Sequence, residues 1–443
     1  MSLSHPCAPW GQWLSALAAA LDPRSAPRLV RLFLGALLAT GRRTVTAWLR
    51  AAGLSAEFRP AYHTLAAAGR RSDRLAARLV HRLLRPLLGG APRFLFALDD
   101  TPTRRYGPKV QGAGVHHNPT PGPAGGRFVY GHSWVVLGWL ARHPLWGAVA
   151  LPLLARLYVR RKDLPRLPDG VRPAFRTKLQ LAVELLLRAV SWLGWLGKPL
   201  WVVADGAFAN AAFLKPAKAA GVTVVSRLRK DAALCSVPRP KPRGRRGRQR
   251  VYGERRVDLA KRAGQRRGWR TRTFDLYGRP AAKTHKTFLA TWRPAGGLIR
   301  VVLVDEPRGW VAFFCTDPDA SVADVLGAVA DRFSLETAFR DAKQVVGAGQ
   351  QQVRKLWANV GAFHVCLWAY TLTEAWAWGR PASALADRGA SPWDDPCRRP
   401  SHADKRRAFR RELLGEEIRR ALRAGTNGED FAAVAERLLN LAA

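Results

Sequence analysis

The sequence predicts a mixed α/β fold in which helices come first and a β-rich region interrupts the core. Residues 1 to about 90 place apolar side chains at spacings of three and four, as amphipathic helices do. Short apolar runs at 94–98 and 200–204 are typical of strands buried on both faces. Between 222 and 316, short runs rich in β-branched and aromatic residues indicate further strands. These three patterns define the fold class.

The composition indicates a polyanionic partner. The chain has 443 residues, with 73 Lys and Arg against 32 Asp and Glu, and a formal net charge of +41. Such a charge repels itself unless a polyanion neutralises it, so nucleic acid is the leading partner. An anionic membrane surface is the alternative, but the basic residues are spread along the chain and no terminal amphipathic anchor is evident. The five cysteines include no C-x-x-C pair, which argues against a zinc ribbon and suits a reducing cytoplasm. We expect neither a signal peptide nor a membrane span, because charges interrupt each long apolar run.

Within the N-terminal helices, residues 41–69 predict two short helices around a turn. Thr44 or Thr46 could cap the first helix, and Gly53 could end it. The pattern fits a DNA-binding helix-turn-helix, and it fits a plain helical hairpin with a basic surface equally well.

The predicted core strands lead into acidic residues. The run 94–98 leads into Asp99 and Asp100, and the run 200–204 leads into Asp205. Runs at 128–141 and 145–159 predict two further strands, and residues 172–195 have helical spacing. Because ligand sites form at the ends of adjacent strands in α/β sheets, we expect these aspartates to lie close together.

A third acidic residue lies on a predicted helix at about 322–346. There, Arg332, Glu336 and Lys343 flank an apolar stripe. A carboxylate between two cations is either a salt-bridge network or a metal ligand beside phosphate-binding cations. Carboxylate oxygens suit Mg²⁺, and two such ions can activate a water or a 3′-hydroxyl in phosphodiester cleavage.

Three further features of the sequence bear on function. The stretch at 239–250, RPKPRGRRGRQR, is either an arm that grips phosphate or a solvated loop. His116, His117 and His132 lack the spacing of a helical metal site, and we expect them to be loop residues near DNA. The glycine-rich stretch at 112–126 lacks the Lys-Ser/Thr of a phosphate loop, so no nucleotide cofactor is expected.

Three motifs together resemble the DDE transposases of bacterial insertion sequences, in particular the IS4-like group and its IS701-like branch. LDDTPTRRYG is similar to the first catalytic motif, and its Asp-x-Thr pattern selects Asp99, with Asp100 as an alternative or supporting residue. WVVADGAFAN is similar to the second, around Asp205. DRFSLETAFRDAK is similar to the terminal signature Tyr-x2-Arg-x3-Glu-x6-Lys, with Arg332, Glu336 and Lys343 in place. Val329 takes the position of the tyrosine, which weakens any role carried by that ring.

The resemblance implies an RNase H-like core with a β-rich insertion and a helical N-terminal DNA-binding domain. It implies a cut-and-paste transposase that uses two Mg²⁺ ions, or Mn²⁺ in their place, held by Asp99, Asp205 and Glu336. Its partners would be double-stranded DNA at the element's inverted-repeat ends, target DNA and a second copy of the chain, in a prokaryotic cytoplasm. The expected DNA-binding residues are Arg332, Arg340, Lys343, Arg245, Arg246 and Arg248. The expected domains are 1–90 (helical), 91–221 (core, first part), 222–316 (insertion), 317–380 (core, second part) and 381–443 (basic tail).

Two alternatives stay open from the sequence. One is a non-enzymatic or inactivated DNA-binding relative that acts as a repressor. The other is a nuclease of the same fold that cuts DNA without joining it. The presence of all three acidic residues argues against the first alternative, whereas Val329 at the tyrosine position keeps it open.

Overall fold

The computed structural model describes residues 9–88, 90, 92–118, 125–241, 246–389, 393–423, 435 and 438. The strands are β1 Phe94–Arg104, β2 Gly114–His117, β3 Phe128–His143, β4 Gly147–Tyr158, β5 Leu200–Ala204, β6 Thr223–Leu228, β7 Leu234–Cys235, β8 Arg256–Val257, β9 Arg270–Leu276, β10 Arg279–Trp292, β11 Gly297–Val304 and β12 Val311–Cys315. The helices that precede them are α1 Pro9–Ala18, α2 Ala26–Leu38, α3 Val45–Ala51, α4 Phe58–Arg70, α5 Ser72–Arg78 and α6 Arg85–Leu88. The later helices are α7 Lys178–Leu193, α8 Ala211–Ala219, α9 Leu259–Gly264, α10 Val322–Gln344, α11 Leu356–Ala377, α12 Ala382–Leu385 and α13 His402–Arg423.

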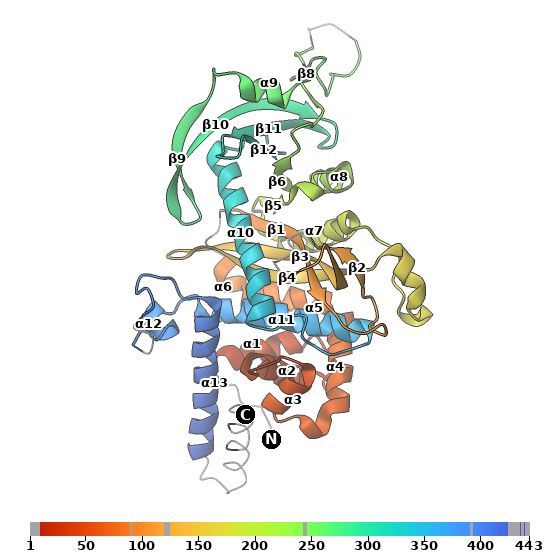
Figure 1. The fold of residues 1–443 in the computed structure, drawn as a ribbon, viewed down its shortest axis with the longest axis vertical. Coiled ribbons are helices and arrows are strands. Elements are labelled where there is room, and N and C mark those ends of the chain that lie inside the picture. The colour runs from red at the N-terminus through yellow and green to blue at the C-terminus, as the bar shows by residue number, and fades with distance from the viewer. Residues whose placement is uncertain are drawn as a thin grey trace.

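The described strands form one mixed sheet. Its order is β2-β3-β1-β5-β6-β12-β11-β10-β7-β8, with β4 paired to β3 and β9 paired to β10. The pairs β1–β5 and β5–β6 are parallel, and β1–β3 is antiparallel. The strands predicted between 222 and 316 are present, and they continue the sheet of the core through β6 and β12 (Figure 1).

The central strand β1 extends further than the sequence predicts. Its apolar run 94–98 is buried, as predicted, but the strand does not end at the aspartates. Its parallel pairing with β5 stops at Leu98, whereas its antiparallel pairing with β3 continues to Arg104. The second partner therefore keeps the chain extended past Asp99 and Asp100.

Helices cover both faces of the sheet. Adjacent residues of a strand point to opposite faces, and Asp99 contacts Arg332 of α10 whereas Asp100 contacts Lys178 of α7. Hence α10 and α7 lie on opposite faces, and Figure 1 shows α10 crossing in front of the sheet. Helix α11 is buried nearly all round, as its apolar sequence predicts, and its Phe363 stacks on Trp134 of β3 at 4.0 Å between ring centroids.

The N-terminal helices include the two predicted at 41–69. Thr44 caps α3 by accepting a hydrogen bond from the amide of Ala47, and Gly53 takes a left-handed conformation with φ of 64° after this helix. Helix α4 packs against α11, so the N-terminal helices join the same hydrophobic core as the sheet.

One described helical run, Lys178–Leu196, is long and apolar enough to cross a membrane by length and composition. In the structure, α7 packs against β3, β4 and α8. Its Glu184 accepts hydrogen bonds from Arg156 at 2.8 Å and Arg176 at 2.9 Å. These are the contacts of a helix packed within a protein.

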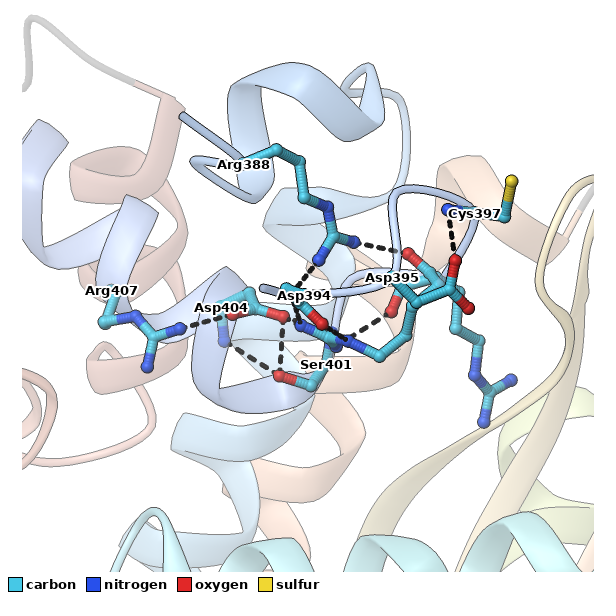
Figure 2. Close-up of polar contacts among 9 residues, drawn as sticks. Arg388, Asp394, Asp395, Cys397, Ser401, Asp404 and Arg407 are labelled. Carbon is cyan, nitrogen blue, oxygen red and sulfur yellow. Dashed lines mark hydrogen bonds and ion pairs between the residues drawn. The ribbon is translucent and has the colours of Figure 1, made fainter. Parts of the chain in front are cut away.

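The C-terminal helix α13 packs against α11 and α2. At its start, the Ser401 hydroxyl donates to the Asp404 carboxylate at 2.7 Å, and the Asp404 amide donates back to the hydroxyl at 3.2 Å. In the preceding loop, the Asp394 carboxylate accepts from both Arg388 and Arg398 (Figure 2). These contacts link Arg388 and Arg398 to Asp394 before α13 begins.

Candidate active site

Asp99 and Asp205 lie side by side in the sheet. Leu98 of β1 pairs in parallel with Ala204 of β5, so each aspartate directly follows a paired residue on a neighbouring strand. Burial raises the pKa of Asp99 to about 6; the Arg332 charge opposes this shift, and the charges of Asp100 and Asp205 add to it. An ionised Asp99 is therefore unfavourable here unless a cation lies beside it.

Helix α10 supplies that cation together with the third acidic residue. The Arg332 guanidinium lies 2.6 Å from a carboxylate oxygen of Asp99 through Nη1, and 2.8 Å from a carboxylate oxygen of Glu336 through Nη2. Ser321 starts the helix in a capping box with Asp324. Arg332 and Glu336 are one turn apart and share one side of the helix. One guanidinium thus joins β1 to α10.

Asp100 belongs to a different set of contacts. It forms an ion pair with Lys178 at the start of α7, on the face of the sheet opposite to Arg332 and Glu336. Lys343 of α10 also feels the charge of Asp100, although burial dominates and lowers the pKa of Lys343 to about 8. Of the two neighbouring aspartates, only Asp99 contacts the Arg332–Glu336 pair.

Asp99, Asp205 and Glu336 are called the acidic cluster below. Apart from Arg332, the other residues singled out from the sequence form no ion pair with it among the described residues. Arg340 is exposed and pairs with Asp341 at 3.3 Å. Arg246 and Arg248 are exposed. Arg245 lies outside the described residues. Val329, at the tyrosine position of the resembled signature, is half-buried against the hydrophobic core.

The expectation that His116, His117 and His132 are loop residues is wrong. His116 and His117 lie on β2, and His132 lies on β3. His132 is fully buried; its Nδ1 accepts from Arg105 Nε at 3.1 Å, and burial lowers its pKa to about 3. Strand β2 accounts for His116 and His117, because it turns part of the predicted loop into sheet. His132 lies in β3, within the run 128–141 that the sequence predicts as a strand.

The acidic cluster has donors suited to a divalent cation. Among the described residues, no three His, Cys, Asp or Glu side chains are close enough to hold a metal ion together. Arg332 forms ion pairs with the carboxylates of both Asp99 and Glu336. Carboxylate oxygens are nevertheless the donors that Mg²⁺ takes, and the buried Asp99 beside Asp205 is a position where added positive charge is favourable.

Lys178 is the contact that sequence reasoning missed. Its position within the predicted helical segment 172–195 gave no sign that it would reach Asp100. Only the packing of α7 on the sheet brings the two together.

A strongly basic α/β chain with carboxylates side by side where two parallel strands stop pairing has the features of an enzyme that acts on nucleic acid. A family model described as DDE superfamily endonuclease matches residues 16–289, well over half of the chain. The chain belongs to this family, and membership implies a DNA substrate. The matched region contains Asp99 and Asp205 and ends before α10, so it does not contain Glu336. No curated protein matches the chain.

Proposed function

We propose that the protein is a transposase of the IS4-like group, in its IS701-like branch, that binds the inverted-repeat ends of its own element. It cuts the DNA there and joins the freed 3′ ends to target DNA, working as a dimer that pairs the two ends. Family membership supports a DNA-cutting enzyme. The observation that carries the proposal is the Arg332 guanidinium joining Asp99 to Glu336 at 2.6 and 2.8 Å, with Asp205 on the next strand.

In this proposal, Asp99, Asp205 and Glu336 hold two Mg²⁺ ions, for which Mn²⁺ can substitute. The ions would supply activation of the attacking oxygen and stabilisation of the leaving oxygen. Arg332 orients Asp99 and Glu336 and neutralises their charge before DNA binds. Lys343 and Arg340, further along α10, contact phosphate. Joining exchanges one phosphodiester for another, so no nucleotide cofactor is needed.

We also propose roles for the chain's segments. Residues 1–90 would recognise the element ends, with α3 and α4 as a candidate helix-turn-helix. Segments 91–221 and 317–380 would form the RNase H-like core, 222–316 the insertion and 381–443 the basic tail. The sequential strands β1, β3 and β4 and the parallel neighbour β5 support the placement of the core.

The test is a cleavage assay on labelled DNA from the borders of the gene, with Mg²⁺. Wild type should cut at the element boundary, and Glu336→Gln and Asp205→Asn should bind the same DNA without cutting it. Glu254→Gln is a matched control, because Glu254 is exposed and pairs only with Arg250 among the described residues. Cutting by Glu336→Gln at the wild-type rate would reject the metal-ligand role.

The same assay separates the alternatives. Products in which the element ends are joined to a target plasmid support transposition. Cutting without joined products favours a nuclease. Binding without cutting by wild type favours a repressor-like relative.

A further inference from the structure

A large open hollow lies close to the acidic cluster, where three parts of the chain meet. It has a volume of about 990 Å³ and lies between the loop before α3, the end of β1 and the segment from the end of α10 to α11. Its five basic lining residues, which we call the basic groove, are Arg42, Arg104, Arg105, Lys343 and Arg354.

The charge of this hollow is of one sign. No aspartate or glutamate lines it, and none of the three exposed arginines, Arg42, Arg104 and Arg354, forms an ion pair within the described part of the chain. Two other hollows differ: one contains Asp73 and Glu184, and the other contains Asp275 and Asp331. A fourth, beside Trp195, lacks carboxylates too, but none of its lining residues comes from β1 or α10. Uncompensated positive charge in a concave site favours an anionic ligand.

Two of the cations are held in place by burial. Arg105 is only 5% exposed; its Nε donates to His132 and its Nη1 to the carbonyl of Gly349. Its buried Nη2 has no hydrogen-bond partner among the described residues. Lys343 is half-buried in the same lining, and its Nζ makes no hydrogen bond or ion pair with any described residue. A buried donor without an acceptor costs about 1–3 kcal/mol, so Arg105 keeps its positive charge at the wall of the hollow without full compensation by the described residues.

The groove is connected to the acidic cluster by α10. Glu336 and Lys343 are seven positions apart on this helix, a rise of about 10 Å. The phosphates of one DNA strand follow each other at about 3.4 Å along the helix axis. We propose that the basic groove binds the phosphodiester backbone of the DNA duplex that is cut at the acidic cluster, about three nucleotides from the cut. This inference rests on the proposed function and adds the path of the DNA.

The test measures how binding depends on salt. Wild type and the triple variant Arg42→Ala, Arg104→Ala, Arg354→Ala are compared by fluorescence anisotropy on a labelled border duplex, in a metal chelator so that binding alone is observed. The charge-matched control is Arg166→Ala, Arg293→Ala, Arg308→Ala, three exposed arginines that line none of the four hollows described above.

If each groove arginine neutralises one phosphate, the slope of log K against log salt should fall by between about 2 and 3 in the groove variant. The slope of log K against log salt should fall by clearly less in the control variant. A photocrosslinking residue in place of Tyr106, which lines the hollow and is 76% exposed, should react about three nucleotides from the cut mapped with Mg²⁺.

The outcomes separate the two proposals. If wild type binds and cuts the DNA but the groove variant loses no more slope than the control, the groove proposal is overturned and the proposed function stands. Crosslinks confined to positions a full helical turn or more from the cut would also overturn it. If wild type neither binds nor cuts the DNA, the proposed function fails and the groove proposal fails with it.

Discussion

Arg332 is the residue on which the acidic cluster depends. An ion pair one helical turn apart on a helix surface contributes only about 0.2–0.5 kcal/mol, and the Arg332–Glu336 pair has this spacing. Its contact with Asp99 is different, because that carboxylate is mostly buried and lies near a second negative charge. The guanidinium therefore serves mainly to compensate Asp99, and it brings Glu336 to the strand.

Metal binding can be tested at the level of Asp99. Mg²⁺ should raise the melting temperature of wild type, because a ligand that binds only the folded state stabilises it by about 2.7 kcal/mol at a concentration of 100 Kd. Asp99→Asn should lose this increase. Asp100→Asn should keep it, since Asp100 pairs with Lys178 on the other face of the sheet. The reverse result would assign the metal to Asp100.

A second residue-scale prediction concerns Glu374, which is buried in α11. Burial alone would raise its pKa, but Lys405 at 2.5 Å and His402 at 2.8 Å outweigh burial and lower the pKa to about 2. Lys405→Met should reduce the free energy of unfolding at pH 7 by about 3–5 kcal/mol, because it leaves a buried carboxylate poorly compensated. Arg407→Met should reduce it by less than about 1 kcal/mol, because Arg407 is exposed and its partner Asp404 keeps its contacts with Arg398 and Ser401.

The pH dependence of this contribution follows from its sign. The folded-state pKa of Glu374 lies below the ordinary value of 4.5. Its stabilisation is therefore present above about pH 4.5 and is lost as the pH falls towards about 2. Urea unfolding of wild type and Lys405→Met across this range should show the difference between them shrinking at low pH. A difference that stays constant would contradict the assignment.

At the scale of elements, the crossing of α4 and α11 holds the N-terminal helices on the core. Gly69 of α4 and Gly361 of α11 form the contact: a Cβ on Gly361 would lie 1.9 Å from the Leu65 carbonyl oxygen, and one on Gly69 would lie 2.0 Å from that of Trp357. The obstructing atoms belong to backbone and cannot rotate away. The two helices can therefore approach this closely only with glycine at the crossing.

Gly361→Ala should consequently reduce the free energy of unfolding by at least about 1–3 kcal/mol, the usual range for overpacking. Gly170→Ala is the control, since a Cβ there meets no atom within 4 Å and the backbone is not left-handed. Denaturant unfolding of the two variants should separate them clearly. Equal stabilities would show that α4 can shift away from α11 at little cost.

At the scale of the whole molecule, the continuous sheet brings distant parts of the sequence to one place. The strands between 222 and 316 extend the sheet from β6, which pairs with β5, and the chain returns through β12 to pair with β6. Helix α10 starts shortly after β12 and crosses back over β1 and β3 (Figure 1). For this reason Arg332, which also contacts Glu336, reaches Asp99 although a long stretch of chain separates them.

The basic stretch at 239–250 lies within this extension, and its role is a prediction about the whole molecule. If it grips phosphate, Arg246→Ala with Arg248→Ala should lower the salt slope of DNA binding by up to about 1.8. Arg166→Ala with Arg308→Ala provides a control of equal charge. A slope equal to that of the control would show that the stretch is a solvated loop.

The local features of this protein could be predicted from its amino-acid sequence. The apolar runs at 94–98 and 200–204, the capping of α3 by Thr44 and the buried character of α11 follow from residue periodicity and residue chemistry, which act over a few neighbouring positions. The same local patterns drew attention to Asp99, Asp205, Glu336 and Arg332.

The arrangement of these features relative to one another depends on the tertiary structure. Pairing with β3 extends β1 past its aspartates. Because α10 and α7 pack on opposite faces of the sheet, Asp99 pairs with Arg332 and Asp100 pairs with Lys178. The basic groove likewise consists of cations from three separated segments. Strand pairing and helix packing depend on contacts between residues far apart in the chain. Local periodicity does not reveal which of those contacts form.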